Sequence, residues 1–97
     1  MKIEFKDQIG IITGAASGLG QAIALKLSVK GVKLALFDRD KSGLEKTQSQ
    51  LTGESELYLV DITVEADVAE AINKVNARFG GVDILVNCAG IAGKRIF

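Results

Sequence analysis

The chain has 97 residues, of which 47% are hydrophobic and 25% charged, a composition typical of one ordinary globular domain. Twelve basic residues cancel twelve acidic ones, so neither a basic nucleic-acid-binding surface nor a polybasic membrane anchor is expected. The absence of histidine excludes Ser-His-Asp catalysis and histidine-dependent metal sites within these residues. The single cysteine cannot form an internal disulfide, and no apolar run approaches the ~20 residues that cross a bilayer. Both observations favour a cytoplasmic protein.

Short apolar runs alternate with helical patterns along the chain. The apolar runs predict strands at 8–13, 32–37, 56–60 and 83–86. The first helix is predicted over 17–30, with an apolar stripe of Leu19, Ile23 and Leu27.

Two further helices are predicted between the later strands. The first is short and polar, with Asp40 or Ser42 as its N-cap and a capping box formed by Ser42 and Glu45. The second would be capped by Thr63 and end at Gly80-Gly81. Its expected apolar stripe consists of Val68, Ile72, Val75 and Phe79.

The resulting order βαβαβαβ implies parallel strands joined by right-handed crossovers. The expected fold over residues 1–97 is an α/β domain with a parallel sheet of order 3-2-1-4, the first half of a doubly wound Rossmann fold. In that order the fourth strand lies at an edge, and no charge within Ile84-Leu85-Val86 discourages pairing. The edge is therefore expected to permit self-association, and the chain resembles the front half of a larger protein.

A glycine-rich turn joins the first strand to the first helix, with the sequence Thr13-Gly14-Ala15-Ala16-Ser17-Gly18-Leu19-Gly20. Glycines adopt backbone angles closed to other residues and let a phosphate approach the main chain. The helix N-terminus behind them presents unpaired N–H groups and about half a unit of positive charge, which favours a pyrophosphate. The alternative is a turn needed only for tight packing of the helix on the strand. A P-loop is excluded, because the sequence lacks Gly-Lys-Ser/Thr.

The glycine spacing, Gly-x3-Gly-x-Gly, resembles the Thr-Gly-x3-Gly-x-Gly motif of the short-chain dehydrogenase/reductase family. The extended, epimerase-like branch uses Gly-x2-Gly-x2-Gly and fits less well, because position 17 is serine. Three later motifs strengthen the resemblance, and each ends a predicted strand: Asp38, Asp61-Ile62 and Asn87-Cys88-Ala89-Gly90. The last is similar to the family's Asn-Asn-Ala-Gly, and the four motifs cover residues 8–91.

The resemblance implies a dinucleotide site in which Asp38 accepts hydrogen bonds from the adenosine ribose. Asp61 and Ile62 would contact the adenine ring. The implied cofactor-binding residues are Gly14, Ser17, Gly18, Leu19, Gly20, Asp38, Arg39, Asp61, Ile62, Asn87, Ala89 and Gly90.

Several of these residues also have a structural interpretation. Asp38 could cap the short helix, although Asp40 is better placed, and Asp61 could cap the third helix in competition with Thr63. Asn87 is expected to be half structural, because the corresponding family residue mainly tethers the central strands.

Further expectations concern the side chains of Thr13, Cys88 and Arg39. The hydroxyl of Thr13 is expected to bridge backbone groups. Cys88 is expected to be a small buried hydrophobe without a nucleophilic role. Arg39 is expected to be a solvated charge that can lie over the adenine.

The expected cofactor is NAD, with NADP less favoured. A carboxylate at Asp38, ~4 Å from a 2′-phosphate, would cost up to ~4 kcal/mol at an effective dielectric near ~20. Ser17 occupies the position where NADP-preferring relatives often have a basic residue. Arg39 instead favours NADP, because its positive charge could partly offset the repulsion.

In the family that this chain resembles, hydride transfer uses a Ser, a Tyr and a Lys acting together, and the last two are spaced Tyr-x3-Lys. The only tyrosine here is Tyr58, and the residue four positions later is Ile62. We therefore assign no catalytic residue and no metal ligand. We expect the NAD-binding portion of an oxidoreductase that interconverts an alcohol and a ketone, with its catalytic segment beyond position 97. The alternatives are a non-catalytic dinucleotide sensor and a truncation product that binds nothing stably.

Overall fold

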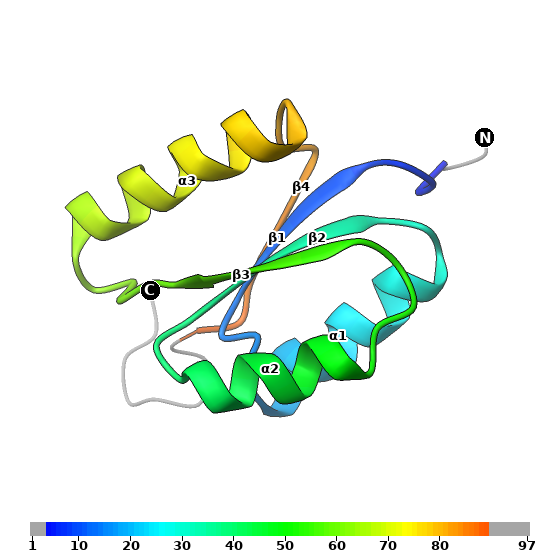
Figure 1. The fold of residues 1–97 in the computed structure, drawn as a ribbon, viewed down its shortest axis with the longest axis horizontal. Coiled ribbons are helices and arrows are strands. Elements are labelled where there is room, and N and C mark those ends of the chain that lie inside the picture. Colours follow the sequence, from blue (N-terminus) through cyan, green and yellow to red (C-terminus); the bar gives the residue numbers. More distant parts are fainter. Residues whose placement is uncertain (1–3, 90–97) are drawn as a thin grey trace.

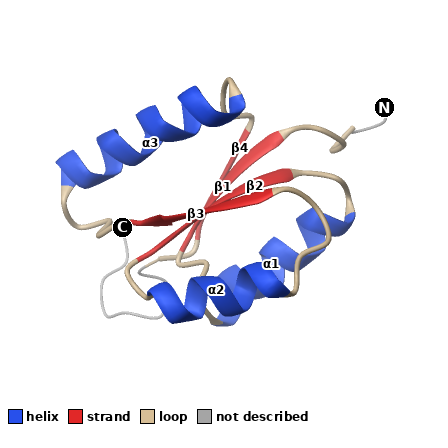
Figure 2. Ribbon diagram, in the orientation of Figure 1, coloured by secondary structure: helices blue, strands red, loops and turns tan. Residues whose placement is uncertain are grey.

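A four-stranded parallel sheet organises the chain, and helices cover both of its faces (Figures 1 and 2). The computed structural model describes residues 4–89. Its elements, in chain order, are β1 (Ile9–Thr13), α1 (Gly18–Val29), β2 (Lys33–Asp38), α2 (Lys41–Ser49), β3 (Ser55–Leu59), α3 (Glu65–Phe79) and β4 (Ile84–Asn87). Each predicted element is present, and most ends differ from the prediction by one or two residues.

The strand order is β3-β2-β1-β4, as predicted, and every pair is parallel. In the register, Thr13 lies opposite Phe37 of β2 on one side and opposite Asn87 of β4 on the other. Asp38 lies opposite Leu59 of β3. The carboxyl ends of all four strands therefore reach the same edge of the sheet, where ligands bind in open α/β folds.

Helix α1 packs against the sheet through small residues, and of the predicted stripe Leu19, Ile23 and Leu27 only Leu19 is wrong. Its buried residues are Gly20, Ala24 and Ser28, whereas Leu19 is 55% exposed. The reason is the close approach of the helix to the strand, which leaves room only for small side chains at the contact. Ile23 and Leu27 flank this contact and pack against the core that α1 and α2 share with the sheet.

Helix α2 begins at an Asp40 N-cap, whose carboxylate accepts a hydrogen bond from Gly43 N at 3.0 Å. This settles the choice left open by the sequence. The predicted Ser42–Glu45 capping box is wrong because Ser42 lies within the helix, where its hydroxyl contacts the Asp40 carboxylate at 3.3 Å.

Among the described helices, α3 is the one that covers the opposite face of the sheet (Figure 1). Its N-cap is Val64, so the predicted Thr63 cap is wrong; Thr63 instead binds the carboxylate of Asp61. Ala71 and Val75 are buried, whereas Ile72 is 36% exposed and lies at the margin of the predicted stripe.

Within residues 4–89, β4 pairs with β1 on one side only, as the predicted order requires. The side chain of Leu85 on this strand is 66% exposed. No helix in the described part of the chain is both long and apolar enough to span a bilayer.

Candidate functional site

The carboxyl edge of the sheet brings together the four motifs singled out in the sequence. The glycine turn follows β1, Asp38 ends β2, Asp61 lies two residues beyond β3, and Asn87 ends β4. Gly90, which the sequence also assigned to this set, lies outside the described residues.

Two of the three motif glycines are required by close contacts within the protein. A Cβ on Gly20 would lie 2.8 Å from the carbonyl carbon of Gly14 and would collide with its oxygen. Gly14 has a φ of 68°, and a Cβ there would lie 2.9 Å from the amide nitrogen of Ala89. These contacts pack the first turn of α1 onto the turn after β1, and they pack that turn onto the segment after β4.

Gly18 has a different role, because a Cβ there would meet no atom of residues 4–89 within 4 Å, apart from its chain neighbours and the backbone of its own helix. Its φ of 59° is in the left-handed region that glycine adopts most readily. Ser17, Gly18 and Leu19 are all exposed, and the Ser17 side chain makes no capping hydrogen bond. The first turn of α1 thus presents N–H groups without intrahelical acceptors to an open space, as expected for an anion-binding helix N-terminus.

The carboxylate of Asp38 is held beside this turn by two backbone amides. One oxygen accepts from Ala16 N at 3.0 Å, and the other accepts from Asp40 N at 3.1 Å. Asp38 therefore does not cap α2. Each carboxylate oxygen has further lone pairs, so both can still accept from a ligand hydroxyl.

Asp61 forms a tight turn with Thr63. One oxygen of its carboxylate accepts from Thr63 Oγ1 at 2.6 Å and from Thr63 N at 3.0 Å, and the other lies 3.5 Å from the guanidinium of Arg39. The Thr63 hydrogen bonds, with a smaller contribution from Arg39, hold the pKa of Asp61 below its ordinary value of 3.8. Asp61 is therefore ionised at neutral pH, and it does not cap α3.

Arg39 contacts this carboxylate, and Ile62 follows Asp61 in the chain. The Arg39 side chain is 75% exposed, in agreement with the predicted solvated charge. Ile62 is half-buried and packs against the core beneath α3.

Thr13 and Asn87 join β1 to β4 at the site edge. The Thr13 hydroxyl donates to Asn87 Oδ1 at 2.7 Å and accepts from Ala89 N at 3.2 Å. It therefore bridges two groups as predicted, but only one of them is a backbone group. The hydrogen bond to Asn87 also supports the tethering role expected for that residue. Cys88 is only half-buried, but burial still raises the pKa of its thiol, so the thiol stays protonated at neutral pH.

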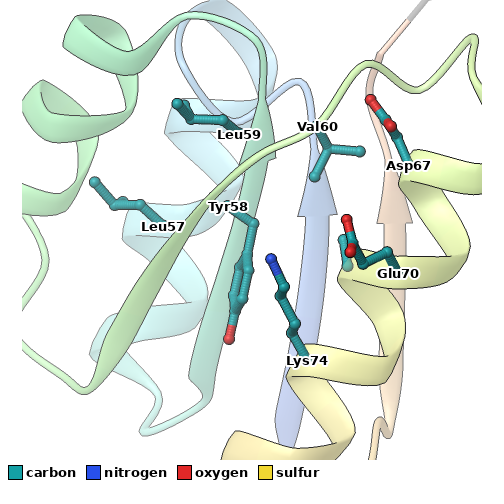
Figure 3. A pocket seen from close by; sticks show the side chains of 8 residues that line it. Leu57, Tyr58, Leu59, Val60, Asp67, Glu70 and Lys74 are labelled. Atoms are coloured by element: carbon teal, nitrogen blue, oxygen red, sulfur yellow. The ribbon is translucent and has the colours of Figure 1, made fainter.

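Away from these motifs, a cavity of about 260 Å³ lies between β3 and α3 (Figure 3). Tyr58 lines it, and Figure 3 shows Lys74 extending from α3 toward the tyrosine ring. The pKa of Tyr58 is raised, first by burial and then by Glu56. A proton-transferring tyrosine needs a pKa shifted toward neutrality, so Tyr58 is not activated in this way.

Thr47 is a residue of the glycine-turn region that the sequence motifs do not mark. Thr47 on α2 is fully buried, and its hydroxyl donates to the carbonyl of Ala15 within the glycine turn. The available signal was its spacing, because Thr47 follows Leu44 by three residues and so falls on the apolar face of a short helix.

Comparison with known proteins identifies the family. The model of the short chain dehydrogenase family matches residues 8–97. The chain belongs to the short-chain dehydrogenase family. An uncharacterized oxidoreductase of Staphylococcus saprophyticus is 38% identical over 93 residues, which cover 92% of this chain and 40% of the relative.

Two solved structures of short-chain dehydrogenase relatives hold nicotinamide dinucleotides. A 3-ketoacyl-(acyl-carrier-protein) reductase from Brucella melitensis, complexed with NADH, superposes with a TM-score of 0.78 at 36% identity, over 84% of this chain and 34% of that one. A metagenomic short-chain oxidoreductase in complex with NADP gives a TM-score of 0.81 at 30% identity, over 86% and 39%. The family fold thus binds NAD-type and NADP-type cofactors, and the present chain spans 32–40% of the length of its curated relatives.

The lowered pKa of Asp61 gives a first prediction. Because the pKa of the folded state lies below 3.8, the Asp61 interactions stabilise the fold above that pH, and this contribution is lost as the pH falls through the folded-state pKa. Thr63→Val should raise the pKa of Asp61 toward 3.8, and by more than Arg39→Gln does, as measured by NMR titration of the carboxyl carbon. Thr52→Val, in the loop before β3, is the control and should leave this titration unchanged. A larger effect of Arg39→Gln would contradict the assignment.

Proposed function

We propose that residues 1–97 form one dinucleotide-binding domain that holds the adenosine diphosphate half of NAD. The observation that carries this proposal is the open space above Gly18, at the N-terminus of α1 and next to the fixed carboxylate of Asp38. A turn needed only for packing would require Gly14 and Gly20, but it would have no use for a glycine at the uncrowded position 18.

The arrangement of the site fits this ligand group by group. The amides around Ser17, Gly18 and Leu19 would bind the pyrophosphate, with the positive end of α1 behind them. Asp38 would accept hydrogen bonds from the adenosine ribose hydroxyls. The adenine would lie near Asp61, Ile62 and Arg39, and the Asn87–Gly90 segment would border the nicotinamide ribose.

The proposed preference for NAD over NADP rests on charge. The Asp38 carboxylate is fixed by two amides and has no cation at hydrogen-bond distance in the described structure. The nearest basic residue in sequence, Arg39, lies 3.5 Å from Asp61 instead. A 2′-phosphate at the ribose would therefore meet an uncompensated negative charge.

The proposed role of the whole protein is that of a cytoplasmic oxidoreductase that interconverts a small-molecule alcohol and ketone. The nicotinamide would supply hydride exchange, and the residues of this chain would bind and orient the dinucleotide. Within the 97 residues there is no Tyr-x3-Lys, and the pKa of Tyr58 is raised. We therefore propose that this chain by itself binds the cofactor without turning over substrate.

The proposed site can be tested with two glycines in matched environments. Gly18 and Gly80 both have positive φ, 59° and 90°, and neither has protein atoms within 4 Å of a built Cβ. Gly18→Asp should abolish NAD binding in calorimetry, because it places a side chain and a negative charge where the pyrophosphate would lie. Gly80→Asp, at the end of α3, imposes a similar backbone strain of about 1–2 kcal/mol and should leave NAD binding unchanged.

The same samples test the absence of turnover. The purified chain should give no NADH from NAD and a panel of alcohols. Steady NADH production that is lost in Gly18→Asp would show that the chain is a complete enzyme. Equal NAD binding by both glycine variants would refute the proposed site.

The cofactor preference can be measured with NAD and NADP side by side. We expect NAD to bind at least ~10-fold more tightly, which corresponds to about 1.4 kcal/mol and is within the repulsion available to a partly exposed charge pair. Asp38→Ala should weaken NAD binding and reduce the preference. Glu54→Ala removes the same charge at the opposite edge of the sheet and should change neither value. Tighter binding of NADP to the wild-type chain would contradict this proposal.

The β4 edge gives a further prediction, about association. Within residues 4–89, β4 pairs on one side only and carries the exposed Leu85, so it favours pairing with a second copy of the chain. We expect the apparent mass in light scattering to rise with concentration, and Leu85→Lys to reduce that rise. Leu59→Lys, on the exposed face of β3, is the matched control, and an equal effect of both variants would argue against association through β4.

A further inference from the structure

Thr47 is a polar residue with no exposed surface, on a helix that is otherwise largely polar and solvated. It shares the inner face of α2 with Leu44, which is also fully buried. A buried hydroxyl is almost always hydrogen-bonded, and its partners show what it holds in place.

The two partners of the Thr47 hydroxyl belong to the glycine turn and to α1. The hydroxyl donates to the carbonyl oxygen of Ala15 at 2.7 Å and accepts from Gln21 Nε2 at 3.0 Å. Gly43, one turn earlier on α2, lies against the same turn, since a Cβ there would be 2.7 Å from the Cβ of Ala16. Helix α2 is therefore a support for the glycine turn.

The contacted carbonyl belongs to the same peptide group as the amide that binds Asp38. Thr47 holds the oxygen of the Ala15–Ala16 peptide, and Asp38 accepts from its N–H at 3.0 Å. Because a peptide group is planar and rigid, fixing both polar ends fixes the orientation of the whole plane. The next residues along the chain are Ser17 and Gly18, which are both exposed.

We propose that Thr47 is a positioning residue for the diphosphate of the cofactor, acting by clamping the Ala15–Ala16 peptide from the side opposite Asp38. This inference rests on the proposed function of the glycine turn. Without the hydroxyl, the carbonyl of Ala15 loses this bond and the peptide can rotate, which misdirects the amides at 17 and 18. Diphosphate binding then weakens more than adenosine binding.

The test compares variants of matched size and burial. Thr47→Val keeps the shape and removes the hydroxyl, whereas Thr47→Ser keeps the hydroxyl. Ser28→Ala is the control, because Ser28 is also buried and its hydroxyl accepts from Thr52 N and Gly53 N. It lies near the far end of α1, so its loss should reduce stability without reaching the glycine turn.

Two measurements distinguish positioning from general stability. Without ligand, the Ala16 amide should exchange its hydrogen about tenfold faster in Thr47→Val than in wild type. In Ser28→Ala, the exchange of the Ala16 amide should rise no more than the overall loss of stability explains. In calorimetry, Thr47→Val should bind ADP about fivefold to tenfold more weakly and adenosine within about twofold of wild type. Thr47→Ser should restore ADP binding to within about twofold.

Each outcome decides between the two proposals. Unchanged Ala16 exchange and ADP binding in a folded Thr47→Val variant would overturn the positioning role, as would an equal loss of ADP binding in Ser28→Ala. A wild-type chain that binds no ADP would refute the dinucleotide function, whereas the exchange result would still test the clamp. If Thr47→Val does not fold, Gln21→Met replaces it, with faster Ala16 exchange and about threefold weaker ADP binding expected. No change there would count against the clamp.

Discussion

The site depends on one close contact, in which the first turn of α1 lies directly against the turn after β1. A side chain at Gly20 would collide with the carbonyl of Gly14, so the contact exists only because position 20 has no Cβ. The same proximity explains why α1 buries Ala24 and Ser28 one and two turns later. The missing methyl therefore sets both the distance of the helix from the sheet and the place where its N-terminus is exposed.

A second layer of close packing converts this turn into a defined binding surface. Helix α2 approaches the turn through Gly43 and Thr47, and β2 contributes Asp38 from the other direction. In the proposed site the pyrophosphate would be bound by backbone amides, which have no rotamers of their own. Their directions depend on the neighbouring peptide groups, and this dependence underlies the proposed effect of buried side chains on affinity.

The positions of the helices, the order of the strands and the place of the phosphate-binding turn were predictable, because each follows from a local pattern in the sequence. Apolar runs that alternate with helical segments predict a parallel sheet. The sequence Thr-Gly-x3-Gly-x-Gly indicates a phosphate-binding turn where a strand precedes it. The errors arose where a contact outside the helical pattern decides which residue is buried or caps the helix. Leu19 fits a helical stripe, but the approach of α1 to β1 favours Gly20; Thr63 fits an N-cap, but the carboxylate of Asp61 binds it first. Thr47 escaped notice because its partner, Ala15, lies 32 residues away.

The ionisable groups of the described residues explain why this arrangement suits binding rather than proton transfer. The pKa of Asp61 is lowered by hydrogen bonds, whereas burial raises the pKa values of Tyr58 and Cys88. Each shift moves the group further from neutrality, which strengthens its ordinary ionisation state. A general acid or base needs the opposite shift, toward the working pH. The carboxylate of Asp61 and the backbone amides of the glycine turn suit the proposed dinucleotide binding, because the charge of Asp61 does not change over the physiological pH range.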